Sequence, residues 1–308
     1  MHKIFVATSS FSSHSEKPLA LFRPNKFQIT LNDKGRKLES DELINRLIDS
    51  YGVIAGTENY SKIVLNRLPK LKVISRVGIG LDNIDIKVAK QKGIKIFKTK
   101  TNLAPAVAEL SLGLMIDIAH NISQSNQAMK SGKWEKQMGA LLMGTTLGII
   151  GLGRIGRELV QLSRSFRFKI LAFDNKKDEV FAKENNVTYC KLDTLLKNSD
   201  FVSIHLNLSD ETEYLINKEK IKLMKHGAIL INTSRGKIID ETALYDALKF
   251  NKLGGAGLDV FEKEPYSGQL TELNNIVLTP HIGSYTKEIR VKMEIEAAEN
   301  LIRGLNET

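Results

Sequence analysis

Three segments in the second half of the sequence carry ionisable side chains that could bind an acid and move a proton. Arg235 lies in residues 232–236, Glu264 in residues 258–265 and His281 in residues 280–283. An Arg can bind a carboxylate through two parallel hydrogen bonds and polarise the neighbouring carbonyl group. A His can donate or accept the proton of a hydroxyl group, and an adjacent Glu keeps that His charged near neutrality. Taken together, these side chains are typical of a hydride-transfer site, although each alone has an ordinary structural explanation.

A glycine-rich motif, GxGxxG at residues 151–156, predicts a dinucleotide site because it follows an apolar strand and begins a helix. Gly151 permits the tight turn, Gly153 lets the backbone approach a pyrophosphate, and Gly156 allows the helix to pack closely on the strand. The amide groups at the start of the helix, at Arg154 and Ile155, would then hold the anion. The alternative is a glycine-rich turn with no ligand.

An acidic residue at the end of the next strand favours NAD as the cofactor. Asp174 lies eighteen residues beyond Gly156 and follows the apolar run at 170–173. A carboxylate there can accept both ribose hydroxyls of NAD and repels the 2′-phosphate of NADP. Lys176 and Lys177 lie just beyond it and weaken the case against NADP.

The elements that would position these residues alternate between short β-branched runs and amphipathic segments, which predicts parallel sheets. We expect a long helix from Ala104 to about Lys130 and an amphipathic C-terminal helix at 286–305. Shorter helices are expected at 41–50, 84–92, 154–166, 178–186, 192–198, 218–223 and 241–250. The expected strands are 4–8, 27–31, 53–56, 73–77 and 94–97, followed by 146–150, 169–173, 201–205, 228–232, 255–259 and 276–279.

Composition narrows the class of protein. The 308 residues are 42% hydrophobic and 26% charged, an ordinary globular mixture of about two domains. The single cysteine, Cys190, excludes an intrachain disulfide and a cysteine-based zinc site, and we expect no metal. Residues 1–8 do not fit a signal peptide, because the apolar run at 4–8 is too short. The longest apolar stretch, 140–152, is too short for a membrane span. A cytoplasmic protein is expected.

The formal net charge is +10, and the surplus is uneven. Residues 1–98 hold 18 Lys and Arg against 9 Asp and Glu, whereas residues 99–281 hold 23 against 21. Charge alone could indicate nucleic acid, but no nucleic-acid-binding motif accompanies it. The surplus is explained either by solvated helix faces or by attraction of a small acidic substrate.

The motifs at 232–236, 258–265 and 279–283 closely resemble those of the NAD-dependent D-isomer-specific 2-hydroxyacid dehydrogenases. The resemblance extends from about Val53 to the C-terminus. It implies a doubly wound Rossmann domain inserted into a flavodoxin-like α/β domain. The NAD-binding domain would be residues 99–281, and the substrate-binding domain would be residues 1–98 and 282–308. It also implies a homodimer formed through the Rossmann domain.

The resemblance further implies roles for individual residues. Arg235 would bind the substrate carboxylate, His281 would be the acid/base with Glu264 as its partner, and Asp259 would hold the nicotinamide amide. Further cofactor contacts would come from His205, Thr233, Ser234 and Gly283. The substrate would also be bound by Arg76, Val77, Gly78, Ile79 and Gly80, where two glycines expose backbone amides that can hold a carboxylate.

Within the family the chain is most similar to the 3-phosphoglycerate dehydrogenases, in a short form without a regulatory domain. In such enzymes an Arg at the position of Arg76 helps to bind the substrate phosphate. Another phosphate-binding Arg is replaced around residues 55–57, and Lys98 and Lys100 depart from the family pattern. Glyoxylate or hydroxypyruvate reduction, or another D-2-hydroxy acid, therefore stays open. An NAD-sensing scaffold of the corepressor type, which shares the Arg, Glu and His, is a further alternative. The sequence does not identify the substrate, the direction or the pathway.

Overall fold

The computed structural model describes residues 2–24 and 27–307 and separates them into two compact units. Unit 1 is Met1–Asn102 with Tyr285–Thr308, and unit 2 is Leu103–Ser284. The chain therefore leaves unit 1, builds unit 2 and returns, as expected for an inserted domain. The sequence placed these boundaries at 98/99 and 281/282, a few residues earlier in each case.

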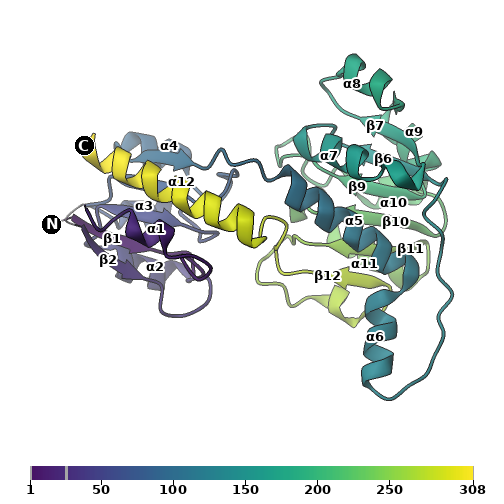
Figure 1. Ribbon diagram of the computed structural model, residues 1–308, viewed down its shortest axis with the longest axis horizontal. Coiled ribbons are helices and arrows are strands. Elements are labelled where there is room, and N and C mark those ends of the chain that lie inside the picture. The colour runs from purple at the N-terminus through teal and green to yellow at the C-terminus, as the bar shows by residue number, and fades with distance from the viewer. Residues whose placement is uncertain (1, 25–26, 308) are drawn as a thin grey trace. The chain divides into compact units, whose positions relative to one another are not determined.

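Unit 1 contains a parallel five-stranded sheet in the order β2-β1-β3-β4-β5, which is the flavodoxin-like order. Helices cover the sheet, and α12 contacts β3, β4 and β5 (Figure 1). The central strand β3, GVIA, is buried along its whole length, whereas the edge strand β2, FQITL, has no buried residue. The strands are β1 His2–Val6, β2 Phe27–Leu31, β3 Gly52–Ala55, β4 Val73–Arg76 and β5 Lys95–Lys98. The helices are α1 Lys17–Ala20, α2 Ser40–Leu47, α3 Lys62–Asn66, α4 Ile86–Gln91 and α12 Lys287–Asn306.

Unit 2 contains a parallel seven-stranded sheet in the order β12-β11-β10-β9-β6-β7-β8, the Rossmann order with one additional strand. The predicted fold class is therefore confirmed in both units. The strands are β6 Thr146–Ile150, β7 Lys169–Phe173, β8 Val187–Tyr189, β9 Phe201–Ile204, β10 Ala228–Asn232, β11 Leu253–Leu258 and β12 Ile276–Leu278. The α-helices are α5 Ala104–His120, α6 Ile122–Lys130, α7 Arg154–Leu162, α8 Glu179–Glu184, α9 Leu192–Asn198, α10 Lys218–Leu223 and α11 Glu241–Lys249.

Helices α1 and α3 and strand β8 were not predicted, and one expected helix is broken in two. Strand β8 was not predicted, because three residues at the edge of a sheet carry too little apolar pattern to be recognised. The long helix expected from Ala104 to Lys130 is broken at Asn121, which adopts the left-handed conformation with φ of 53°. Asn tolerates this conformation better than most residues. Asp117 then accepts a hydrogen bond from the Ser123 amide, 2.7 Å away, at the start of α6.

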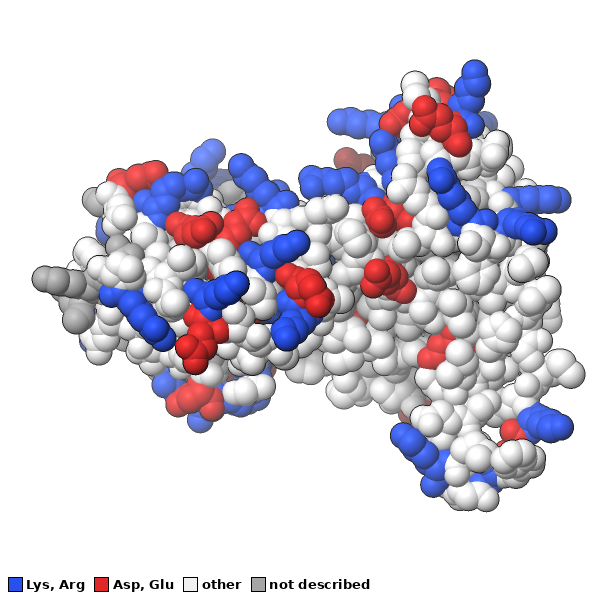
Figure 2. Space-filling view, in the orientation of Figure 1, with Lys and Arg blue, Asp and Glu red and all other residues white. Residues whose placement is uncertain are grey.

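The charged side chains are dispersed on the face shown in Figure 2. Over unit 1, Lys and Arg side chains alternate with Asp and Glu side chains instead of forming one continuous basic surface. On this face the basic surplus of residues 1–98 therefore fits solvated helix surfaces. Among the described residues, no helix is long and apolar enough to cross a membrane.

The topology of unit 2 determines where its predicted site residues gather. Strand order reverses between β6 and β9, and ligands of open α/β sheets bind beyond the carboxyl ends of the strands at such a point. The glycine motif follows β6, Asp174 follows β7, and His205 follows β9. The loops that carry Arg235, Glu264 and His281 follow β10, β11 and β12 on the same edge.

Candidate active site

The glycine motif forms a turn that only glycine can adopt without strain or collision. Gly151 has φ of +96°, and a Cβ there would lie 2.6 Å from the carbonyl oxygen of His205. A Cβ on Gly156 would lie 2.4 Å from the carbonyl oxygen of Gly151, so the glycine lets α7 approach β6. A Cβ on Gly153, in contrast, would meet no atom within 4 Å. Gly153 thus faces open space at the N-cap of α7, where a pyrophosphate needs room.

The first turn of α7 fits a bound anion. Gly153 provides no side-chain cap, so the helix does not satisfy its own first amides through a capping side chain. The macrodipole of α7 also favours negative charge at this end. Arg154, the first residue of the helix, is exposed. The residues present therefore fit the pyrophosphate of NAD.

Asp174 lies beside the glycine loop because of strand register. Ile150 of β6 pairs with Phe173 of β7, so the residues that follow the two strands are neighbours. The Asp174 carboxylate accepts hydrogen bonds from the Leu152 amide at 2.7 Å and from the Lys176 amide at 2.8 Å. It is thereby fixed at the end of β7 and partly exposed, as a ribose-binding carboxylate requires.

His281 and Glu264 form a hydrogen-bonded pair. His281 Nδ1 lies 2.8 Å from Glu264 Oε2, and the two side chains are 37% and 25% exposed. An ionised carboxylate only accepts hydrogen bonds, so Nδ1 is the donor and Nε2 remains to exchange a proton with substrate. His281 has φ of 55°, so the loop turns sharply at this residue. The geometry is that of a proton donor whose tautomer is held by a carboxylate.

The loop that carries Arg235 is held by its own polar residues. Asn232 donates to the carbonyl oxygen of Arg235 at 2.9 Å, and its side-chain oxygen accepts from the amide and the hydroxyl of Ser234. Arg235 Nη1 donates to the carbonyl oxygen of Ser234 at 2.7 Å. These bonds stabilise the conformation of the loop.

Gly236 brings the Arg235 loop against the Glu264 loop. Asn232 of β10 pairs with Leu258 of β11, so the two loops leave the sheet side by side. A Cβ on Gly236 would lie 1.9 Å from the carbonyl carbon of Phe261, a distance that no side chain permits. The close approach of backbone to backbone therefore requires glycine at this position.

Asp259 is a buried carboxylate that holds the His281 loop. Its Oδ1 accepts from the Thr279 hydroxyl at 2.6 Å and the Ile282 amide at 2.7 Å, and its Oδ2 accepts from the Gly283 amide at 2.7 Å. The residue is 1% exposed, and burial raises the pKa of its carboxyl group, although the three hydrogen bonds oppose that effect. Leu258 pairs with Leu278, which places Asp259 opposite Thr279.

Two further residues expected near the cofactor lie at the same edge. The Nε2 atom of His205 is 2.9 Å from the Ser203 hydroxyl, and burial lowers the pKa of the ring to about 4. Its Nδ1 is buried with no hydrogen-bond partner among the described residues. The Thr233 hydroxyl lies 2.9 Å from that of Ser111 on α5.

In unit 1 the segment expected to bind substrate follows β4. Gly78 has φ of +152°, and Ile79 and Gly80 are partly exposed. Within residues 2–24 and 27–307, the amides of Gly78, Ile79 and Gly80 donate no hydrogen bond to a backbone or side-chain atom. Consecutive amides of this kind can hold an anion. Arg76 ends β4, and its Nη1 donates to the carbonyl oxygen of Val77 at 2.5 Å.

Comparison with known proteins agrees with this geometry. Residues 112–283 match the profile of the D-isomer specific 2-hydroxyacid dehydrogenase, NAD binding domain. The hydroxypyruvate reductase of Thermotoga maritima is 44% identical over 87% of this chain and 89% of its own. The chain belongs to the D-isomer specific 2-hydroxyacid dehydrogenases. It is accordingly an NAD-dependent oxidoreductase.

Two other relatives bear on the substrate of this dehydrogenase. The glyoxylate reductase of Thermococcus litoralis is 42% identical over 80% of this chain and 77% of its own. The D-3-phosphoglycerate dehydrogenase of Methanocaldococcus jannaschii is 38% identical over 87% of this chain but only 52% of its own.

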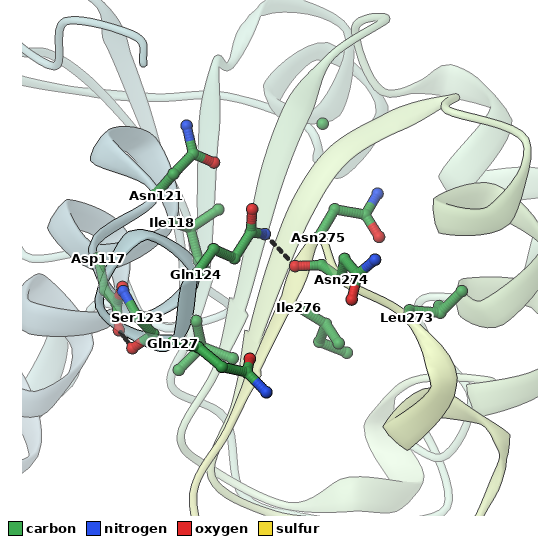
Figure 3. A pocket seen from close by; sticks show the side chains of 12 residues that line it. Asp117, Ile118, Asn121, Ser123, Gln124, Gln127, Leu273, Asn274, Asn275 and Ile276 are labelled. Carbon is green, nitrogen blue, oxygen red and sulfur yellow. Dashed lines mark hydrogen bonds between the residues drawn. The ribbon is translucent and has the colours of Figure 1, made fainter. Parts of the chain in front are cut away.

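One small cavity of the dehydrogenase, of about 120 Å³, lies away from these residues. It is lined by α5, α6 and the amino ends of β11 and β12, at the opposite edge of the sheet from the catalytic loops. Figure 3 shows its amide side chains, with Gln124 donating to the carbonyl oxygen of Asn274. None of the catalytic, cofactor-binding or substrate-binding residues predicted from the sequence lines this cavity.

Several residues that hold the loops carrying Arg235, Glu264 and His281 had no role predicted from the sequence. Asn232 lies within the motif at 232–236 but was not recognised as its internal clamp, and Gly236 was not recognised as the contact between loops. Thr279 lies within the motif at 279–283, but its hydrogen bond to Asp259 was not predicted. Ser111 was missed because its partner, Thr233, is distant in sequence.

Proposed function

We propose that this dehydrogenase reduces a short, unphosphorylated 2-keto acid, with hydroxypyruvate as the first substrate to test and glyoxylate as the second. In unit 2, Arg235 binds the carboxylate and His281 supplies the proton. In unit 1, the amides of Gly78, Ile79 and Gly80 form a turn that can hold an anion. The observation that carries this proposal is the hydrogen bond between His281 and Glu264, in the same unit as the Arg235 loop.

The proposed mechanism assigns each polar side chain one task. The glycine loop and Asp174 would hold NADH, which would supply the hydride for the keto carbon. Arg235 holds the carboxylate and polarises the adjacent carbonyl group. His281 donates its Nε2 proton to the carbonyl oxygen as that atom becomes a hydroxyl. Glu264 stabilises the positive charge on the imidazolium before transfer and fixes the ring orientation throughout.

The choice of an unphosphorylated substrate rests on the relatives. The alignment with this chain covers 89% and 77% of the two reductases, but only 52% of the phosphoglycerate dehydrogenase. The second candidate, 3-phosphohydroxypyruvate, is favoured by Arg76 at the end of β4 and by the basic surplus of residues 1–98.

An NADH-oxidation screen at 340 nm tests the proposal. It compares hydroxypyruvate, glyoxylate, 3-phosphohydroxypyruvate, pyruvate and 2-oxoglutarate. We expect hydroxypyruvate to have the highest kcat/KM, and His281→Asn to lower kcat by about 10²–10⁴-fold. Full turnover in His281→Asn would remove His281 from the mechanism. NADH binding without turnover of any 2-keto acid would favour an NAD-sensing scaffold instead.

We also propose a homodimer formed through unit 2. Trp134, Met138 and Leu141 are 80%, 96% and 70% exposed in the segment that joins α6 to β6. In Figure 1, α6 and this segment extend away from the sheet of unit 2. Exposed large apolar side chains of this kind favour a protein–protein contact. Light scattering of the wild type and of Trp134→Ala/Met138→Ala tests it, and a monomeric wild type at micromolar concentration would overturn it.

A further inference from the structure

A carboxylate on the C-terminal helix, Glu296, takes no part in the proposed chemistry but binds the backbone of a segment distant in sequence. Its Oε1 accepts a hydrogen bond from the Lys100 amide at 2.7 Å. Its Oε2 accepts from the Thr101 amide at 3.0 Å and from the Thr101 hydroxyl at 2.8 Å. Hydrogen bonds to an ionised acceptor are stronger than those between neutral groups. One side chain of α12 therefore fixes two consecutive residues that follow β5.

Two further contacts attach β4 and the end of β5 to the same helix. The Asn300 side chain donates to the carbonyl oxygen of Lys98 at 3.4 Å. The Ser75 hydroxyl of β4 is buried and donates to the carbonyl oxygen of Ala297 at 2.8 Å. Strands β4 and β5 are paired neighbours, and α12 contacts both of them (Figure 1). The helix thus holds the chain that leaves β5 in a defined position relative to the end of β4.

Thr99 joins this segment to the turn after β4. Its amide donates to the carbonyl oxygen of Gly78 at 3.1 Å, and the residue is 1% exposed. Thr99 directly precedes Lys100, whose amide Glu296 binds, so the position of the Thr99 amide depends on that carboxylate. The hydrogen bond in turn fixes the direction of the Gly78 carbonyl group.

The direction of the Gly78 carbonyl determines that of the Ile79 amide. A trans peptide unit is planar, so the C=O of one residue and the N–H of the next point in opposite directions. The bond from Thr99 therefore directs the Ile79 N–H away from the segment that follows β5. In the described part of the chain this N–H donates no hydrogen bond, and Ile79 is partly exposed. The amide is thus available to an anion.

We propose that Glu296 is a positioning residue for substrate binding. It holds residues 100–101, and this keeps the Thr99 amide on the Gly78 carbonyl. The Ile79 amide is then directed so that it can bind the carboxylate of a 2-keto acid. This inference rests on the proposed function, because it assigns a 2-keto acid to the turn after β4. Since Glu296 acts only through the backbone of unit 1, its loss should weaken binding of the keto acid without slowing the chemical step.

Glu296→Ala tests the inference because it removes all three hydrogen bonds. We expect at least a tenfold rise in the KM for hydroxypyruvate and in the Kd for oxamate, an unreactive analogue of a 2-keto acid, titrated by calorimetry with NADH present. Tenfold is about 1.4 kcal/mol, close to the strength of one hydrogen bond to a charged group. The kcat and the Kd for NADH should change by less than threefold. The matched control is Glu299→Ala, which removes an exposed carboxylate from the same helix and should leave all four values unchanged.

Hydrogen exchange followed by mass spectrometry gives a readout that needs no ligand. In Glu296→Ala the amides of residues 99–101 should exchange at least tenfold faster than in the wild type, whereas those of β1 should change little. Glu299→Ala should exchange as the wild type does. Unchanged exchange at 99–101 in folded Glu296→Ala would show that the carboxylate does not hold the segment, and would overturn the inference.

The remaining outcomes separate this inference from the proposed function. If Glu296→Ala is not folded by circular dichroism, Glu296→Gln, which keeps one acceptor oxygen, should raise the Kd for oxamate at least threefold. An unchanged Kd for oxamate in a folded variant overturns the inference, even when hydroxypyruvate is turned over normally. An equal rise in the Kd for NADH also overturns it, because the effect would then be general. Weaker binding of oxamate, with no turnover of any 2-keto acid by the wild type, overturns only the proposed function.

Discussion

Replacing Asp259 by Asn should impair both the positioning of His281 and folding. The carboxylate offers two oxygens to three donors, the Thr279 hydroxyl and the amides of Ile282 and Gly283. An Asn side chain keeps one oxygen and replaces the other by an NH₂ group. If the oxygen stays beside Thr279 and Ile282, the NH₂ group faces the Gly283 amide, and two donors confront each other.

The magnitude follows from these three bonds. Hydrogen bonds to a charged acceptor contribute about 1.5–3 kcal/mol each, and a buried donor left without an acceptor costs about 1–3 kcal/mol. The remaining two bonds weaken because the acceptor becomes neutral. Removing a buried charge offsets part of the loss, since burial already raises the pKa of Asp259. We expect a net loss of about 2 kcal/mol, or roughly 4–8 °C in the Tm of a domain of this size.

The expected catalytic effect is similar in free energy to the loss of stability, since each tenfold fall in rate is about 1.4 kcal/mol. A displacement of about 1 Å in a catalytic group can lower the rate roughly 10²-fold, so kcat should fall about 10–100-fold at temperatures where the variant remains folded. Asp210→Asn, an exposed Asp in unit 2, is the matched control. Thr279→Val removes one donor and keeps both backbone amides, so its effect should be intermediate.

The assay combines thermal unfolding, steady-state kinetics and NADH titration by fluorescence. If Asp259 acts by holding the His281 loop, kcat falls while the Kd for NADH changes by less than about threefold. A large rise in that Kd with unchanged kcat would refute the reasoning and favour the nicotinamide contact implied by the family resemblance. Unchanged stability and kcat would show that the three hydrogen bonds do not hold the loop.

Three other predictions concern unit 2. Burial lowers the pKa of His205 in the folded chain to about 4. Between pH 6.5 and 4 the unfolded chain therefore binds a proton at His205 that the folded chain does not bind. Stability should then fall by about 3 kcal/mol as pH decreases through that window, and urea unfolding of His205→Gln should lack this dependence. Gly236→Ala should abolish soluble folding because of the contact with Phe261, whereas Gly227→Ala, with φ of +78° and open space, should remain folded in the same expression test. Asp174→Ser should raise the KM for NADH and reduce the preference of the enzyme for NADH over NADPH. Unchanged kinetics with both cofactors would show that Asp174 does not bind the ribose.

Local sequence was sufficient to predict most elements, because apolar runs with β-branched residues bounded by Gly, Asn or Asp indicate buried strands independently of what packs on them. Strands Phe27–Leu31, Thr146–Ile150, Lys169–Phe173 and Ala228–Asn232 have the predicted bounds. The break at Asn121 was missed because the apolar spacing continues across it from Ile118 to Ile122. The turn depends on the left-handed conformation of Asn121 and on the hydrogen bond from the Ser123 amide to Asp117.

The sequence by itself determined the two α/β folds, the NAD motif and the order of Arg235, Glu264 and His281, since each depends on residues close together in the chain. Tertiary structure decided which groups share hydrogen bonds. Strand register places Asp259 opposite Thr279 and Asp174 beside Leu152. These partners lie about twenty residues apart, and local propensity contains no information about register. For that reason Asp259 was expected at the nicotinamide, while its hydrogen bonds to the His281 loop became apparent only in the folded chain.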